Sequence, residues 1–113
     1  MIQKRTEATI QQEIIVWFRN KYCLAFMDTP CVIFSVPNET AAGYLEMRKL
    51  KLTGLFSGVS DLIVVMPNRL LFVEVKTPVG RQSVKQKYFE KLVTNLGFNY
   101  HLVRSLEDFK QLM

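Results

Sequence analysis

The sequence predicts a three-layer α/β domain built around a mixed sheet of about four strands. Some segments space their apolar residues as an amphipathic helix does, and others are short runs of Val, Ile, Leu and Phe. The two central runs are apolar on both faces, as happens when helices cover a sheet on each side. The elements follow the order α-β-α-β-β-α-β-α, and 113 residues leave room for one domain without a linker.

The first half of the chain predicts two helices and one strand, followed by a pair of strands. A helix is expected over residues 6–22, with apolar residues at helical spacing: Ile10, Ile14, Trp17 and Phe18. A short buried strand is expected over 31–36, and a second helix over 40–52. The residues of this helix that we expect to face inward are Tyr44, Met47 and Leu52. Two further strands are expected over 61–66 and 70–77.

The second half predicts a helix, a strand and a closing helix. The segment Ser83-Val84-Lys85-Gln86 matches a capping box, so a long helix is expected over 83–96. Gly97 follows it as a typical C-terminal glycine. A last strand is expected over 100–103 and a short helix over 106–112.

The turn between the two central strands determines which side chains face each other. It is expected at Pro67-Asn68-Arg69, since proline favours the first corner of a turn and asparagine tolerates a positive φ at the second. A two- or four-residue turn sets Asp61 directly opposite Glu74, with Cβ atoms about 4.5–5.5 Å apart. A three-residue loop would instead set Asp61 opposite Val75, on the wrong face.

Three charged residues then converge on one face of otherwise apolar strands. Glu74 and Lys76 lie two positions apart, so they project from the same face as Asp61. Two carboxylates can hold a hard cation such as Mg²⁺, which activates water and neutralises a phosphate. Lys76 can lower the pKa of that water or stabilise the charged transition state. The alternative is a surface ion pair with Asp61 as a strand-end cap, although unpaired charge on buried strands is costly.

The wider pattern resembles a known nuclease family. The segments that carry the resemblance are Gly58-Val59-Ser60-Asp61-Leu62, Val73-Glu74-Val75-Lys76, Gly80-x2-Ser83-x2-Gln86, Glu7-x2-Ile10-Gln11 and Val36-Pro37-Asn38. Together they are similar to the VRR-NUC (virus-type replication-repair nuclease) branch of the PD-(D/E)xK superfamily, over roughly residues 7–103. One departure is Ser60, which stands where the superfamily has proline before the aspartate.

The resemblance implies a restriction-endonuclease-like core with Mg²⁺ or Mn²⁺ as cofactor. It implies that Asp61, Glu74 and Lys76 are catalytic, and we add Gln86 as a candidate that orients phosphate or water. Asp61 and Glu74 would ligate the metal, together with the Val75 backbone carbonyl. Stand-alone members of the branch come from phages and bacteria, act on DNA in replication and repair, and are dimers associated with four-way junctions.

For several candidate residues, the sequence is compatible with a structural role as well as a functional one. Glu7 either reaches the metal or favours the N-terminus of its helix by charge. Gln86 also completes the capping box, and both roles are compatible. Asn38 either contacts the nucleic-acid backbone or caps the following helix. His101, the one histidine, lies in a predicted strand and is expected to be structural, so no zinc site is expected.

Positive charge is concentrated in the middle of the chain. The net charge is +5, and residues 48–104 alone hold ten basic and three acidic side chains. This distribution fits a polyanionic partner, although a solvated basic face would look the same. The candidate nucleic-acid-binding residues are Asn38, Arg48, Lys49, Lys51, Ser60, Arg81, Ser83, Lys85 and Lys87.

We therefore expect a metal-dependent, structure-selective DNA endonuclease that cuts branched DNA such as four-way (Holliday) junctions in replication, repair or recombination. A homodimer is expected through Leu55-Phe56 with Tyr44 and Leu45. Two alternatives stay open: a non-catalytic nucleic-acid-binding module, and a nuclease that prefers flaps or RNA. The chain has no apolar run of about 20 residues and no signal-peptide pattern, so the cytoplasm of a bacterial or phage-infected cell is expected, with Cys23 and Cys31 as free thiols.

Overall fold

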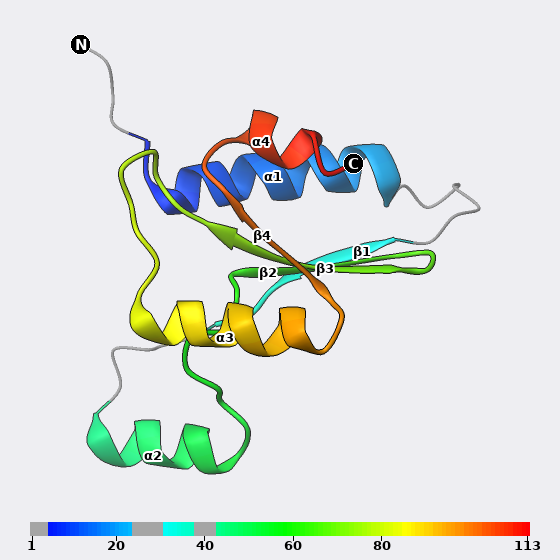
Figure 1. The fold of residues 1–113 in the computed structure, drawn as a ribbon. Coiled ribbons are helices and arrows are strands. Elements are labelled where there is room, and N and C mark those ends of the chain that lie inside the picture. The colour runs from blue at the N-terminus through cyan, green and yellow to red at the C-terminus, as the bar shows by residue number, and fades with distance from the viewer. Residues whose placement is uncertain (1–4, 24–30, 38–42) are drawn as a thin grey trace.

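Four strands form one mixed sheet in the order β1-β2-β3-β4 (Figure 1). The structure is a computed structural model that describes residues 5–23, 31–37 and 43–113. Its elements are α1 (Glu7–Tyr22), β1 (Val32–Ser35), α2 (Tyr44–Leu52), β2 (Leu62–Met66), β3 (Arg69–Val75), α3 (Val84–Asn95), β4 (Asn99–Val103) and α4 (Leu106–Lys110). Neighbouring strands are antiparallel except β3 and β4, which are parallel. The predicted element order and the predicted mixed four-stranded sheet are confirmed.

Helices cover both faces of this sheet. On one face, α1 and α4 pack through a core of fully buried residues: Ile10, Ile14, Phe18, Ile33, Leu62, Val64, Leu71, Val73, Val75, Val103 and Phe109. On the other face, α3 packs through Phe89 and Val93 against Tyr100, with Phe72 and Val59 beside them. Residues of β3 therefore alternate between the two cores, which places Glu74 on the α3 face.

Local sequence signals determine where the long helices begin and end. The Thr6 hydroxyl accepts a hydrogen bond from the Thr9 amide (3.1 Å) and caps α1. The predicted capping box at the start of α3 is present in full between Ser83 and Gln86. Gly97 follows α3 with a φ of +94°, a conformation that costs glycine little.

The turn between β2 and β3 has the length that the sequence suggested. Met66 pairs with Arg69, so Pro67 and Asn68 form a two-residue loop, and Asn68 adopts a φ of +60°. Leu62 is paired with Val73, so the next positions along the ladder bring Asp61 beside Glu74. The predicted register is confirmed.

Two predictions about burial are wrong. Tyr44 and Leu52, expected to face inward, are 79% and 78% exposed, and α2 stands apart from the sheet (Figure 1). The expected strand over 31–36 is not a buried one: β1 lies at the edge of the sheet, and only its Ile33 is buried. An amphipathic pattern shows that a helix has an apolar face, but not whether that face has a partner within the same chain. Residues 40–42 of the expected second helix lie outside the described residues.

No described helix is long and apolar enough to cross a membrane. Both cysteines are free and partly buried beside the core. The Cys23 thiol donates to the Cys31 carbonyl oxygen over 3.2 Å, linking the end of α1 to the start of β1.

Candidate active site

The two carboxylates meet because β2 and β3 are antiparallel and in register. Asp61 directly precedes β2, and Glu74 lies near the end of β3. The Asp61 Oδ2 accepts a hydrogen bond from the Val75 amide (2.8 Å), which holds the Asp61 carboxylate against β3. Glu74 is only 1% exposed, whereas Asp61 borders an open pocket. The pair therefore consists of one buried and one accessible carboxylate.

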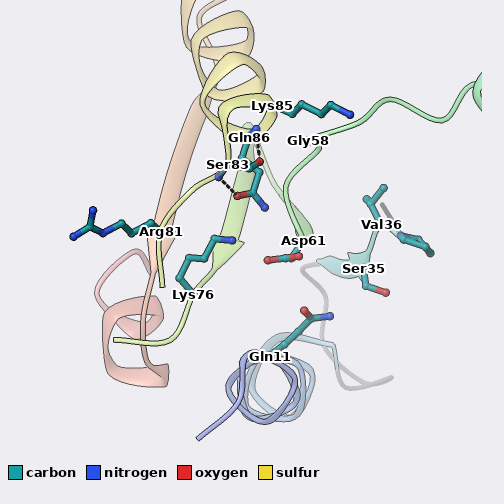
Figure 2. A pocket seen from close by; sticks show the side chains of 11 residues that line it. Gln11, Ser35, Val36, Gly58, Asp61, Lys76, Arg81, Ser83, Lys85 and Gln86 are labelled. Atoms are coloured by element: carbon teal, nitrogen blue, oxygen red, sulfur yellow. Dashed lines mark hydrogen bonds between the residues drawn. The ribbon is translucent and has the colours of Figure 1, made fainter. Parts of the chain in front are cut away.

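The Lys76 ammonium lies close to two carboxylates, those of Glu74 and Glu7. Its Nζ lies 3.8 Å from the Glu74 Oε1 and 3.8 Å from the Glu7 Oε1. Its amide donates to the Val103 carbonyl (3.0 Å), so β4 anchors the backbone at this position. Lys76 itself is 8% exposed, and its ammonium points toward Asp61 across the pocket (Figure 2). All three predicted charges thus lie together, and Glu7 reaches them from the first turn of α1.

Glu74 sits where a negative charge is costly. Burial is the largest cause that raises its pKa, followed by the charge and close contact of the Asp61 carboxylate. Glu7 adds to this effect, Lys76 opposes it, and the net result is a pKa of about 8. The site therefore favours an added positive charge, either a proton or a cation.

The residues present fit a divalent cation. Among the described side chains, the Glu74 Oε2 is buried without a hydrogen-bond partner, an unusual state for a carboxylate oxygen. Carboxylate oxygens are the ligands that Mg²⁺ and Mn²⁺ prefer. Within the described ranges no three His, Cys, Asp or Glu side chains gather as a preformed cage. A hard cation here would thus be held by Asp61 and Glu74, with remaining positions for water and substrate.

Both polar atoms of the Gln86 side chain contact neighbouring residues. Its Nε2 donates to the Glu74 Oε1 (3.0 Å), and its Oε1 accepts from the Ser83 amide (2.8 Å). The capping box that begins α3 thereby holds Glu74 in place. The contact between Gln86 and Glu74 was missed by the sequence reasoning, because nothing in the spacing of the two residues shows that α3 crosses β3 at this point.

Asp61 and Lys76 border a pocket of about 650 Å³, whereas the Glu74 side chain is buried and does not line it. The lining of the pocket comes from α1, the end of β1 and the residues after it, the segment before β2, the residue after β3, and the segment that leads into α3 with its first turn: Gln11, Ser35, Val36, Pro37, Gly58, Asp61, Lys76, Arg81, Ser83, Lys85 and Gln86 (Figure 2). Gln11 was not a predicted site residue, although it follows Glu7 by four positions and so shares its helix face.

Gly58 is essential to the shape of this pocket. It has a φ of +90°, and a Cβ there would lie 2.3 Å from the Lys85 carbonyl oxygen. Only glycine lets the segment before β2 pass this close to the first turn of α3. That close approach brings Asp61 and the α3 N-terminus into one site.

The remaining candidates divide into three groups. Arg81, Ser83 and Lys85 line the pocket, and Lys87 is exposed two residues further along α3. The basic residues of α2 are exposed but do not line the pocket: Arg48, Lys49 and Lys51. Ser60 is fully buried and donates its hydroxyl to the Leu62 carbonyl (3.2 Å), so its side chain faces the protein interior rather than a nucleic acid.

Asn38 and His101 are the last two residues for which the sequence predicted a role. Asn38 lies outside the described residues. His101 lies in β4 opposite Val73, and burial, with a smaller effect of Arg69, lowers its pKa. It is part of the sheet and does not line the pocket.

Comparisons with known proteins agree with the fold. The family model of the VRR-NUC domain matches residues 5–107. A solved structure described as a VRR_NUC domain protein aligns with a TM-score of 0.77 at 19% sequence identity, covering 98% of this chain and 87% of that chain. At this identity the alignment shows a shared fold. No curated protein matched the chain.

Proposed function

The chain belongs to the VRR-NUC family, a family of nuclease type, and on that premise we propose that it is a divalent-metal-dependent DNA endonuclease. The proposal rests on one observation above all. Asp61 and Glu74 lie side by side, Glu74 keeps a buried oxygen without a hydrogen-bond partner, and Lys76 lies 3.8 Å from the same carboxylate. A binding module has no use for such an electrostatically costly arrangement, whereas phosphodiester hydrolysis needs it.

In this mechanism Asp61 and Glu74 would hold the cation, and the Val75 carbonyl and Glu7 are further candidate ligands. When bound, Mg²⁺ or Mn²⁺ supplies a nucleophilic water and neutralises charge on the phosphate.

The protein's own side chains supply the rest of the mechanism. The Lys76 ammonium stabilises negative charge that develops on the scissile phosphate. Gln86 holds Glu74 at a fixed orientation through its 3.0 Å hydrogen bond. Arg81, Ser83 and Lys85 border the pocket and bind the neighbouring phosphates.

The test compares cleavage by the wild type with three single replacements: Asp61→Ala, Glu74→Ala and Lys76→Ala. Each replacement is expected to abolish cleavage while leaving DNA binding in place, because the apolar residues of the two cores are unchanged in all three variants. Glu107→Ala and Lys110→Ala are the matched controls, since this ion pair lies on α4 and neither residue lines the pocket. Cleavage at the wild-type rate in any one of the three site variants would contradict the proposed catalytic site.

The cation is tested in the same assay. EDTA should stop cleavage, Mg²⁺ or Mn²⁺ should restore it, and Ca²⁺ should support binding with little turnover. Cleavage that continues in EDTA would contradict the metal dependence. Including flapped DNA and RNA among the substrates decides between a junction-cutting enzyme and the two alternative nucleases.

The proposed substrate is branched DNA, and the proposed assembly is a homodimer. Tyr44, Leu45 and Phe56 are exposed on or next to α2, the helix that stands apart from the sheet (Figure 1). Such an apolar surface suits an isologous interface, in which both copies use the same patch. Two sites related by a two-fold axis could then meet two strands of a four-way junction in the cytoplasm of a bacterial or phage-infected cell.

Light scattering tests the dimer, and substrate competition tests the junction preference. A mass near 13.2 kDa at micromolar concentration would rule out the dimer. Leu45→Glu should shift a dimer toward the monomer, because it places a charge in the apolar patch. Equal cleavage of a four-way junction and a plain duplex would remove the structure selectivity but not the nuclease.

A further inference from the structure

The outward face of α3 carries an exposed aromatic ring that the active site does not use. The helix turns Phe89 and Val93 toward the sheet, and Gln86 toward Glu74. On the opposite side, Val84 and Tyr88 lie one turn apart and are 85% and 57% exposed. Within the described residues, Tyr88 makes no ring contact, although the neighbouring Phe89 contacts three other rings.

The exposed charges of α3 all have the same sign. The exposed charged residues of α3 are Lys85, Lys87 and Lys91. The one acidic residue of the helix, Glu90, is half-buried, and its Oε1 accepts a hydrogen bond from the Gln82 side-chain Nε2 (3.0 Å). A tyrosine ring surrounded by lysines is the combination with which proteins bind single-stranded nucleic acid, because cations follow the phosphates while an aromatic ring receives a base.

This face is continuous with the candidate active site. Lys85 lines the pocket at the start of α3, close to Gly58 (Figure 2). Tyr88 follows Lys85 by three positions, about 4.5 Å along the helix axis and on an adjacent part of the surface. A strand of duplex DNA advances about 3.4 Å per nucleotide, and an extended single strand advances further. A nucleotide one or two positions from a phosphate in the pocket is therefore within reach of the Tyr88 ring.

We propose that the α3 face formed by Lys85, Lys87, Tyr88 and Lys91 binds a single-stranded DNA segment beside the cleavage site, with the Tyr88 ring stacked on an unpaired base. The bases of an intact duplex are stacked on each other and offer the ring no free surface. Tyr88 thus distinguishes DNA with a single-stranded flank from plain duplex. The position of this segment relative to cleavage rests on the proposed nuclease function, whereas the binding itself does not.

Fluorescence anisotropy with labelled oligonucleotides in EDTA, where metal-dependent cleavage does not contribute, tests the proposal. Tyr88→Ala is expected to weaken binding of a single-stranded oligothymidylate about five- to hundred-fold and binding of a duplex of equal length less than two-fold. Tyr88→Phe should bind as the wild type does, because the ring and not the hydroxyl stacks. Leu96→Ala is the matched control, since Leu96 is 73% exposed at the far end of the same helix.

The outcomes separate this proposal from the nuclease assignment. Lys76→Ala should lose cleavage and keep the preference for single strands, so an inactive enzyme leaves the binding measurement valid. Unchanged affinity of Tyr88→Ala for the single strand, or an equal loss for single strand and duplex, would overturn the proposal. A change of mass in light scattering for Tyr88→Ala would assign the face to a second copy of the chain instead.

A second measurement uses the unaltered protein. Irradiating it with an oligonucleotide that contains 5-iodouracil should crosslink Tyr88, which mass spectrometry identifies by the modified peptide. Crosslinks confined to residues outside α3 would contradict the proposal even if a variant fails to fold.

Discussion

Replacing Glu74 with glutamine should stabilise the metal-free protein at alkaline pH while it abolishes cleavage. The carboxyl group is buried beside Asp61, and its pKa rises from 4.5 to about 8. At about 1.36 kcal/mol per pKa unit, ionising Glu74 in the folded protein costs at most about 4–5 kcal/mol. The Gln amide must find partners in the same space, so we expect a net gain of about 1–3 kcal/mol. For a domain of this size, that gain raises Tm by roughly 4–12 °C.

The direction of the pH dependence follows from proton binding. Between pH 4.5 and about 8, Glu74 holds a proton in the folded protein that it has lost in the unfolded chain. The stability that this proton provides is fully present below pH 4.5 and is lost as pH rises through about 8. Glutamine does not titrate, so the difference in Tm between Glu74→Gln and the wild type should be small at pH 5 and largest above pH 8.

Thermal melting in EDTA from pH 5 to pH 9 measures this difference directly. Glu107→Gln is the control, because Glu107 is exposed on α4 and pairs only with Lys110 among the described residues. Adding Mg²⁺ at pH 8 should raise the Tm of the wild type and have little effect on Glu74→Gln, which lacks one metal ligand. The reasoning is refuted if Glu74→Gln melts below the wild type at pH 9 without metal, or if the difference in Tm is the same at every pH.

Three further predictions concern the frame of the site and its surface. Gly58→Ala should lower the free energy of unfolding by about 2–4 kcal/mol in denaturant titrations, because the new Cβ would meet the Lys85 carbonyl. Gly54→Ala is the control: Gly54 also has a positive φ but has open space around it, so the loss should be only about 1 kcal/mol. Gln86→Ala should lower metal affinity, measured by calorimetry, about 10- to 100-fold, because Glu74 loses the group that orients it; an unchanged affinity would limit Gln86 to capping. Replacing Lys85, Lys87 and Lys91 together should lower the log–log salt slope of DNA binding by about one unit for each phosphate that these lysines bind in the wild type. A slope that does not change would show that the three lysines only solvate the surface.

Several features of the site could be predicted because they depend on residues close together in the chain. The turn at Pro67 and Asn68 has two residues, and this length alone puts Asp61 beside Glu74. Alternation along β3 then puts Glu74 on the α3 face, and Lys76 lies next to it just beyond the strand. The capping box at Ser83 is likewise a signal contained within four residues.

Burial and long-range contacts could not be predicted in the same way. Tyr44 and Leu52 have a helical spacing, yet α2 stands apart from the sheet and leaves both exposed. Ser60 precedes the metal-binding aspartate of the proposed site, but the chain turns its hydroxyl inward to the Leu62 carbonyl. In each case the pattern specifies a local conformation, while burial depends on which other element covers the residue.

The sequence by itself determined the elements, the central register and the three charges that meet there, because turn length and side-chain alternation are local properties of the chain. Only the tertiary structure decided that Gln86 contacts Glu74 and that Glu7 approaches Lys76. The same is true of the close approach of Gly58 to the first turn of α3. Those contacts join residues from different layers of the fold. They depend on how α1 and α3 pack against the two faces of the sheet, and that packing is a property of the whole core rather than of any one segment.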